Sequence, residues 1–415
     1  MYLRGNQWTM TRRRRKPSNP WSVLVLLVLV GVALYFTQVV VPATPPLFIP
    51  TPTPTRSPES FVSEAEAYFK EGKLEQAIAA YKQSIQTDPR NPATYLVLAR
   101  AQIYAGSYQE ALITSENALI LNPDNPTALA LKAWALNFLA DSLSAEATVK
   151  QALQLEPNNA LAHAIYAEIL MDTGDFGNIE AAVAESQKAQ LLSPGMLEVR
   201  RARGYVLLNT QNFDEAIEEF RAAIAINDKY WELHYLLGIA YRAKGEDYDL
   251  AVQEMLRAVA LNPTNPNIPT DIARTYATIG QFGKAVQAAE QALKIEPSNP
   301  RLHGNLGVML YKNQQYERAV YELGLAVRGG TTTDGVVVEG LPLQPGRVAD
   351  EYYSIYGLSL TQLDRCAEAV PIFQLILQNI GADQVAYYNA SEGLTYCQEN
   401  SGTPSPETPT PQPTP

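Results

Sequence analysis

The stretch PATYLVLARAQIYAGSYQEALITSENALILNPDN (residues 92–125) is one unit of a 34-residue pattern that returns along most of the 415-residue chain. The alanine at the twentieth position of the unit recurs nine times, at intervals of 34, 34, 37, 34, 35, 34, 34 and 50 residues. These alanines are Ala77, Ala111, Ala145, Ala182, Ala216, Ala251, Ala285, Ala319 and Ala369. A fixed period of this length predicts a stack of repeated supersecondary units.

Each unit has the pattern of two helices joined by a turn. Position 8 is alanine or glycine in every unit, and small residues at positions 8 and 20 let two helices approach closely. Position 32 is proline in six of the nine units, and a proline there stops the second helix. Runs such as LNPDNP (121–126) and IEPSNP (295–300) therefore predict a helix end, a turn and a new helix.

This pattern resembles the tetratricopeptide repeat over roughly residues 58–383. The resemblance, in particular to bacterial membrane-anchored proteins of that family, implies an all-α, right-handed solenoid of about nine helix-turn-helix repeats. One more helix, at residues 384–400, is expected to cap the solenoid where a tenth repeat would begin. Proteins of this kind bind other proteins, so the chain is not expected to be an enzyme.

The interval of 50 residues contains an insertion before the ninth unit, at about residues 330–349. The β-branched run at 336–338 is followed, across Gly340, by the apolar run at 341–343. This pattern predicts that the two runs pair as a short hairpin.

The N-terminal end predicts a membrane anchor. Residues 21–41 (WSVLVLLVLVGVALYFTQVVV) carry no charge and are long enough to span a bilayer as a helix. Residues 1–20 hold six basic residues and no acidic one, which predicts a cytoplasmic N-terminus and an extracytoplasmic repeat domain. A cleaved signal peptide is the alternative, although the apolar stretch is long for one and VVVPATPP is a poor cleavage site.

Two Thr/Pro-rich tracts flank the repeats. Residues 42–57 are expected to form a semi-rigid linker and residues 401–415 a disordered tail, because such sequences favour extended polyproline II structure and bury little.

Charge and composition limit the kinds of ligand that the protein is expected to bind. The net charge is −11, and it becomes −17 when the six basic residues of the N-terminal tail are left out. So acidic a domain is not expected to bind nucleic acid. His163, His234 and His303 all occupy position 4, two repeats apart, so they are interpreted as packing residues; neither a metal site nor a cofactor is expected.

The chain has two cysteines. Cys366 lies in the turn of the ninth unit, and Cys397 lies near the end of the capping helix. Parallel first helices of successive units place both at the same end of neighbouring hairpins, which favours a disulfide over two buried thiols.

Candidate ligand-binding residues follow from the resemblance, because the first helix of each tetratricopeptide pair lines a concave groove. Aromatic, arginine and asparagine side chains at these positions have the composition of an interaction hot spot, centred on Trp134. The candidates are Leu96, Arg100, Tyr104, Trp134, Asn137, Phe138, Arg201, Tyr205, Asn209, Tyr235 and Arg242. The alternative is that some of the aromatics only pack against the next unit.

The favoured function is that of a membrane-anchored extracytoplasmic scaffold that binds peptides or proteins of the cell envelope. An accessory subunit that positions an envelope enzyme acting on glycans or peptidoglycan is the alternative. A cytosol-facing protein resembling import receptors fits less well, because the arginine cluster predicts the opposite topology.

Overall fold

The computed structural model describes residues 19–40, 56–382 and 384–400, in two separate units that divide after Arg56. The first unit contains α1 (Pro20–Tyr35), which continues as the π-helical turn η1 (Phe36–Val40). The six basic residues of the N-terminal tail, most of the Thr/Pro-rich linker and the C-terminal tail lie outside the described residues.

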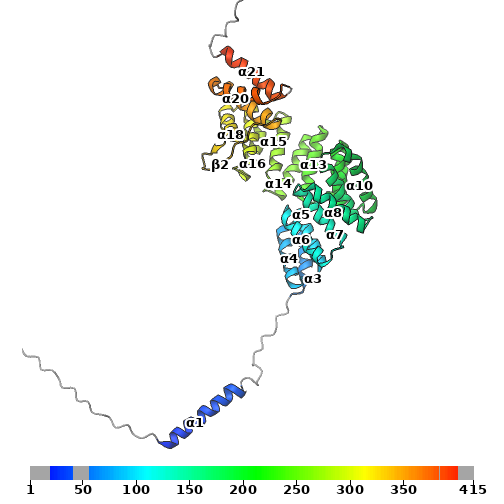
Figure 1. Cartoon of the computed structure of the whole chain (residues 1–415), viewed down its shortest axis with the longest axis vertical. Helices are drawn as coiled ribbons and strands as arrows, with labels where there is room; N and C mark the ends of the chain where they lie inside the picture. The colour runs from blue at the N-terminus through cyan, green and yellow to red at the C-terminus, as the bar shows by residue number, and fades with distance from the viewer. Residues whose placement is uncertain (1–18, 41–55, 383, 401–415) are drawn as a thin grey trace, which may run out of the picture. The chain divides into compact units, whose positions relative to one another are not determined.

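The second unit is a succession of nine helix pairs, visible from α3 onward in Figure 1. The first helices are α3 (Pro58–Lys70), α5 (Pro92–Tyr104), α7 (Pro126–Phe138), α9 (Ala160–Asp172), α11 (Leu197–Asn209), α13 (Trp231–Lys244), α15 (Asn267–Thr278), α17 (Pro300–Lys312) and α19 (Ser354–Thr361). The second helices are α4 (Leu74–Thr87), α6 (Tyr108–Leu121), α8 (Ser142–Leu155), α10 (Ile179–Leu192), α12 (Phe213–Ile226), α14 (Tyr248–Leu261), α16 (Phe282–Ile295), α18 (Tyr316–Arg328) and α20 (Cys366–Asn379). The short turn η2 (Phe176–Asn178) precedes α10, and the π-helical turn η3 (Val348–Tyr353) leads into α19. This architecture confirms the expected all-α repeat fold.

The small residues of the repeat create the contact between the two helices of a pair. All nine alanines at position 20 are completely buried. A Cβ atom at Gly204, in position 8, would lie 2.7 Å from the ring of Phe220, in position 24. The same approach recurs at Gly307, whose Cβ would lie 2.5 Å from Leu323. A larger residue at position 8 would therefore push the two helices apart.

The turn within each pair requires a left-handed backbone conformation, with a positive φ angle, at position 15. Five repeats supply glycine there, for example Gly106 with φ +80°. The other four place a residue with a Cβ in the same conformation, namely Ala140, Gln211, Gln314 and Asp364. A residue with a Cβ atom has a higher free energy in this conformation than glycine has, so these four turns are strained.

A histidine at position 4 joins the two helices of three repeats. The Nδ1 atom of His234 lies 2.7 Å from Glu254 in position 23, and its Nε2 atom lies 3.0 Å from the carbonyl oxygen of Asp228 in the preceding repeat. His163 and His303 repeat this arrangement with Glu185 and Glu322. The histidines are thus buried packing residues that link successive repeats.

The insertion forms a hairpin with a different partner from the one predicted. Strands β1 (Gly330–Thr331) and β2 (Val337–Val338) pair antiparallel, so 341–343 is not the second strand. Gly335, with φ +83°, makes the tight turn between them. After β2 the chain returns to the end of α18, where the Leu341 N–H donates to the carbonyl oxygen of Ala326.

The last helix, α21 (Val385–Asn400), packs against α19 and α20. A disulfide joins Cys366, the first residue of α20, to Cys397 of α21, with the two Cα atoms 5.4 Å apart. The C-terminal end of the solenoid is therefore held by a covalent bond.

Candidate functional site

The concave positions of repeats 2 and 5 meet across the interior of the solenoid. Arg100 of α5 donates from Nε to Glu198 of α11 over 2.5 Å, although the two residues are 98 positions apart in the sequence. The Tyr104 hydroxyl donates to the same carboxylate oxygen. Glu198 is 2% exposed, so this contact is part of a buried interface between distant repeats.

Repeats 1 and 2 also contact the turn between repeats 5 and 6. The rings of Tyr104 and Tyr230 lie 4.2 Å apart, edge to face. A Cβ atom at Gly72 would lie only 2.6 Å from the Cβ atom of Lys229. These contacts, together with the Glu198 cluster, define an interface that we call the repeat seam. The repeat seam joins repeats 1 and 2 to repeat 5 and to the turn before repeat 6.

A second buried charge cluster lies behind the seam. Arg201 of α11 donates to Glu232 over 2.6 Å and also to Glu168, while its guanidinium lies 5.4 Å from the centre of the Trp134 ring. Burial raises the pKa of Glu168 to about 7, against the opposing charge of Arg201. Two carboxylates share one guanidinium here, and Glu168 therefore exchanges its proton near neutral pH in the folded state.

The expectation that Trp134 faces an open groove is wrong. Its side chain is 1% exposed, and it contacts Tyr104 and Phe138 besides Arg201. The reason is the winding of the solenoid, which brings α11 against the concave positions of α5 and α7. Position 9 of the third repeat is therefore a core position.

The other candidates divide between this core and the surface. Leu96 packs against the same apolar cluster, and Phe138 stacks on Tyr108. The Asn137 amide and the Tyr205 hydroxyl both donate to Asp172, and Asn209 is exposed. Tyr235 and Arg242 both donate to Asp271 of the seventh repeat. The candidates therefore do not form one continuous binding surface.

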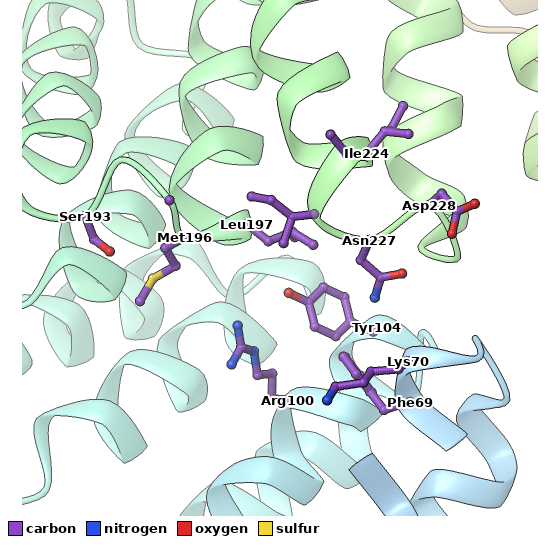
Figure 2. A pocket seen from close by; sticks show the side chains of 13 residues that line it. Phe69, Lys70, Arg100, Tyr104, Ser193, Met196, Leu197, Ile224, Asn227 and Asp228 are labelled. Carbon is purple, nitrogen blue, oxygen red and sulfur yellow. The ribbon is translucent and has the colours of Figure 1, made fainter. Parts of the chain in front are cut away.

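A cavity of about 910 Å³ lies at the repeat seam. Figure 2 shows Arg100 and Tyr104 on one wall and Met196, Leu197 and Asn227 on the other. The walls are mostly apolar, and Arg100 is already paired with Glu198. Lys70 supplies an exposed ammonium at the edge of this cavity.

The C-terminal half has a different concave face. A cavity of about 410 Å³ lies between the first helices of repeats 6 to 8 and the start of repeat 9, and we call it the polar cavity. It is lined by Tyr235, Pro266, Asn267, Thr270, Asp271, Arg274, Glu296, Asn299, Arg301, Leu302, Asn305, Arg347 and Tyr352. Three arginines from three elements thus share one opening.

The groove positions of the repeat pattern contribute Tyr235, Arg274 and Asn305 to this cavity, although only Tyr235 is among the candidates named from the sequence. Arg301 occupies position 2 and Arg347 lies in the insertion, so neither stands out in a repeat pattern read one unit at a time. The signal that points to it is the presence of two asparagines and two arginines, Asn267, Arg274, Arg301 and Asn305, on the first helices of two successive repeats.

Comparison with known proteins identifies the repeats. The tetratricopeptide repeat family matches residues 68–136, 201–266 and 270–333. Human tetratricopeptide repeat protein 13 is 29% identical over 122 residues, which are 28% of this chain and 14% of that protein. The small glutamine-rich tetratricopeptide repeat-containing protein 2 of Mycosarcoma maydis is 33% identical over 84 residues, which are 20% of this chain and 24% of that protein. The chain thus spans well under two thirds of either relative.

A solved structure supports the fold over a longer range. The human IFIT1 dimer with PPP-AAAA has a TM-score of 0.54 and 19% sequence identity, covering 82% of this chain and 81% of that one. At this identity the likeness concerns the fold alone. Repeats of this kind indicate a scaffold for protein–protein interaction. Repeat pattern, fold and family matches agree that the chain belongs to the tetratricopeptide-repeat family.

Proposed function

We propose that this protein is a membrane-tethered, non-catalytic scaffold that binds protein or peptide segments of the cell envelope through the concave face of repeats 6 to 9. The observation that carries the proposal is the contrast between two sets of first helices. In repeats 2 to 6 the concave side chains of Arg100, Tyr104 and Arg201 make contacts within the protein. In repeats 6 to 9 the first helices supply side chains that line the polar cavity.

The proposed tether rests on the N-terminal unit. The helix over Pro20–Val39 has a mean hydropathy of 2.3 and none of it is buried, so its length and composition suit a membrane span. A signal sequence has the same properties. The excess of basic residues before the helix supports an anchor whose C-terminal side faces away from the cytoplasm.

A reporter fusion tests the tether. A β-lactamase fused after Pro415 is expected to make intact cells resistant to a β-lactam antibiotic. The full-length fusion is expected to stay in the membrane fraction. Release of a shortened fusion into the soluble fraction would support a cleaved signal sequence. Activity only from a cytoplasmic reporter would reverse the proposed topology.

A cavity-filling variant tests the binding face. Asn267 is exposed and lines the polar cavity, so Asn267→Trp adds bulk there without changing charge. Gln287→Trp, at an exposed position on the second helix α16, is the matched control. Capture of envelope proteins on the full chain should be lost in the first variant and kept in the second. Equal capture by both would remove the polar cavity as the docking site.

A further inference from the structure

A cavity of about 400 Å³ lies under the hairpin of the insertion, and we call it the hairpin cavity. Its walls come from the second helices α16 and α18 and from the tip of the hairpin, and Figure 1 shows β2 beside these helices. Helix α17 contributes His303 and Leu306 to this cavity but Arg301 and Asn305 to the polar cavity. The two cavities therefore lie on different faces of α17.

Hydrogen bonds hold the walls of the hairpin cavity in place. The Thr333 N–H at the tip of the hairpin donates to the Tyr321 hydroxyl of α18 over 3.0 Å. Arg318 of α18 donates to Glu290 of α16 over 2.6 Å. The cavity is therefore formed before any ligand arrives, which lowers the cost of ordering the site on binding.

Part of the lining is apolar. Leu293 of α16, Leu306 of α17 and Val336 of the hairpin contribute aliphatic side chains. Tyr321 adds an aromatic ring and is 41% exposed. The face of an aromatic ring carries partial negative charge, so it attracts the weakly positive C–H groups of a ligand that lies flat on it.

The charged groups of the hairpin cavity balance one another. The ion pair between α16 and α18 is neutral, and the Glu322 carboxylate lies 2.6 Å from the Nδ1 atom of His303. Lys294 and Asp334 are exposed, and neither makes an ion pair with another described residue. One ammonium group and one carboxylate thus remain for a ligand, so the cavity has no preference for a cation or an anion.

The remaining polar groups include both donors and acceptors. Lys294 can only donate hydrogen bonds, and the Asp334 carboxylate can only accept them. The hydroxyl groups of Tyr321 and Thr333 donate no hydrogen bond within the described part of the chain and can do either. A ligand that pairs with all of these groups needs polar groups that both donate and accept, as hydroxyl groups do.

We infer that the hairpin cavity binds a neutral saccharide, with one face of a sugar ring against Tyr321 and its hydroxyl groups hydrogen-bonded to Lys294 and Asp334. A sugar ring is uncharged and combines an apolar C–H face with hydroxyl groups, which matches the lining. The cavity volume lies within the range of small-molecule sites. The inference goes beyond the proposed function, because this site lies apart from the polar cavity and does not depend on it.

The test measures binding of chitotriose, cellotriose and maltotriose to the full chain by isothermal titration calorimetry, in a detergent whose headgroup is not a sugar. At least one trisaccharide should bind in the millimolar range or tighter, with an affinity that does not change with salt. Tyr321→Ala should weaken this binding about tenfold, because it removes the ring contact. Tyr388→Ala is the matched control, at a tyrosine of α21 that is 65% exposed, and should bind like the parent chain.

Asp334→Asn tests the polar contacts separately. It removes the carboxylate and keeps a sequence suited to the tight turn, since Asn-Gly and Asp-Gly favour the same turn. This variant should keep the melting temperature of the parent chain and bind the trisaccharide less tightly.

Four results would overturn the inference. Binding of none of the trisaccharides would exclude a saccharide site. Binding that both Tyr321→Ala and Asp334→Asn leave unchanged would place the sugar elsewhere on the protein. Tighter binding of trigalacturonate than of the neutral trisaccharides would show that charge governs the site. Binding of the peptide Gly-Trp-Gly, but of no sugar, with loss in Tyr321→Ala, would make the occupant an aromatic side chain of a protein partner. In each case the proposed function at the polar cavity stands.

Discussion

Repeats 1 to 6 and repeats 6 to 9 are built from the same unit but use their concave positions in opposite ways. At position 9, the third repeat places Trp134, which is 1% exposed, and the seventh places Arg274, whose side chain is 37% exposed. The first lies in a core that distant repeats close together, whereas the second lines an open cavity.

The difference shows that a position in the repeat does not by itself decide whether a residue binds a ligand. Arg100 and Arg201 are residue types typical of a binding groove, yet both are paired within the protein. Arg201 pairs with Glu168 and Glu232 in the core, and the partly exposed Arg100 pairs with the buried Glu198. Removing one partner of such a buried pair costs far more than removing an exposed charge.

The largest expected effect comes from truncating Trp134. Trp134→Ala should destabilise repeats 2 to 6 by about 3–5 kcal/mol, because it leaves a cavity in a core that several repeats share. Hydrogen exchange should show faster opening of α5, α7 and α11. Arg274→Ala, at the same repeat position, should change stability by no more than about 0.5 kcal/mol. Similar effects of the two changes would remove the contrast between the halves.

The disulfide is expected to act only at the other end of the solenoid. Replacing Cys366 and Cys397 by serine opens a loop with a sequence separation of 31. The chain-entropy model gives about 3–4 kcal/mol for a loop of this size. Because stability in a solenoid is local, α20 and α21 should exchange faster while α5 and α11 keep their protection. Faster exchange in every repeat would contradict a local role.

The buried charge cluster makes the N-terminal half sensitive to pH. Since burial raises the pKa of Glu168 to about 7, the folded state holds a proton that the unfolded chain releases at lower pH. Stability should therefore fall as pH rises from about 4.5 to 7, the usual value for glutamate being about 4.3.

Glu168→Gln removes this titration and keeps an acceptor for Arg201. The variant should be more stable than the parent chain at pH 8, on the order of 1–3 kcal/mol, and lose that advantage below pH 5. Urea unfolding at both pH values measures it. A variant that is less stable than the parent chain at pH 8 would show that the fold does not raise the pKa of Glu168.

The smallest effect concerns the turns, which the two halves share. Ala140→Gly and Gln314→Gly should each stabilise the protein by about 1 kcal/mol, because both residues have positive φ angles. Gly106→Ala, where a Cβ has open space, should destabilise by a similar amount. Equal gains in the two halves would show that they differ in their concave faces and not in the repeat scaffold.

The sequence predicts the local structure well, because each repeat encodes its own helices, turn and contact with its neighbour. The alanines at position 20 and the small residues at position 8 lie at the helix contacts that the pattern predicts. The repeat seam was not predictable in the same way, because it depends on a rotation that accumulates over several repeats. One sign was present: Glu168, Glu198 and Glu232 also occupy concave positions, where they complement Arg100 and Arg201. The predicted pairing of the hairpin was wrong for a local reason. The Asp-Gly turn at 334–335 pairs residues 337–338 with residues 330–331, which precede the turn.

The most direct test of the contrast is arginine labelling of the native full chain with phenylglyoxal, read by mass spectrometry. Arg201 and Arg301 both lie on concave positions of first helices, but Arg201 is 3% exposed and Arg301 is exposed. Arg301 should be modified rapidly and Arg201 should stay protected until the protein is unfolded in urea. Modification of both residues at the same rate in the native chain would contradict a closed N-terminal half.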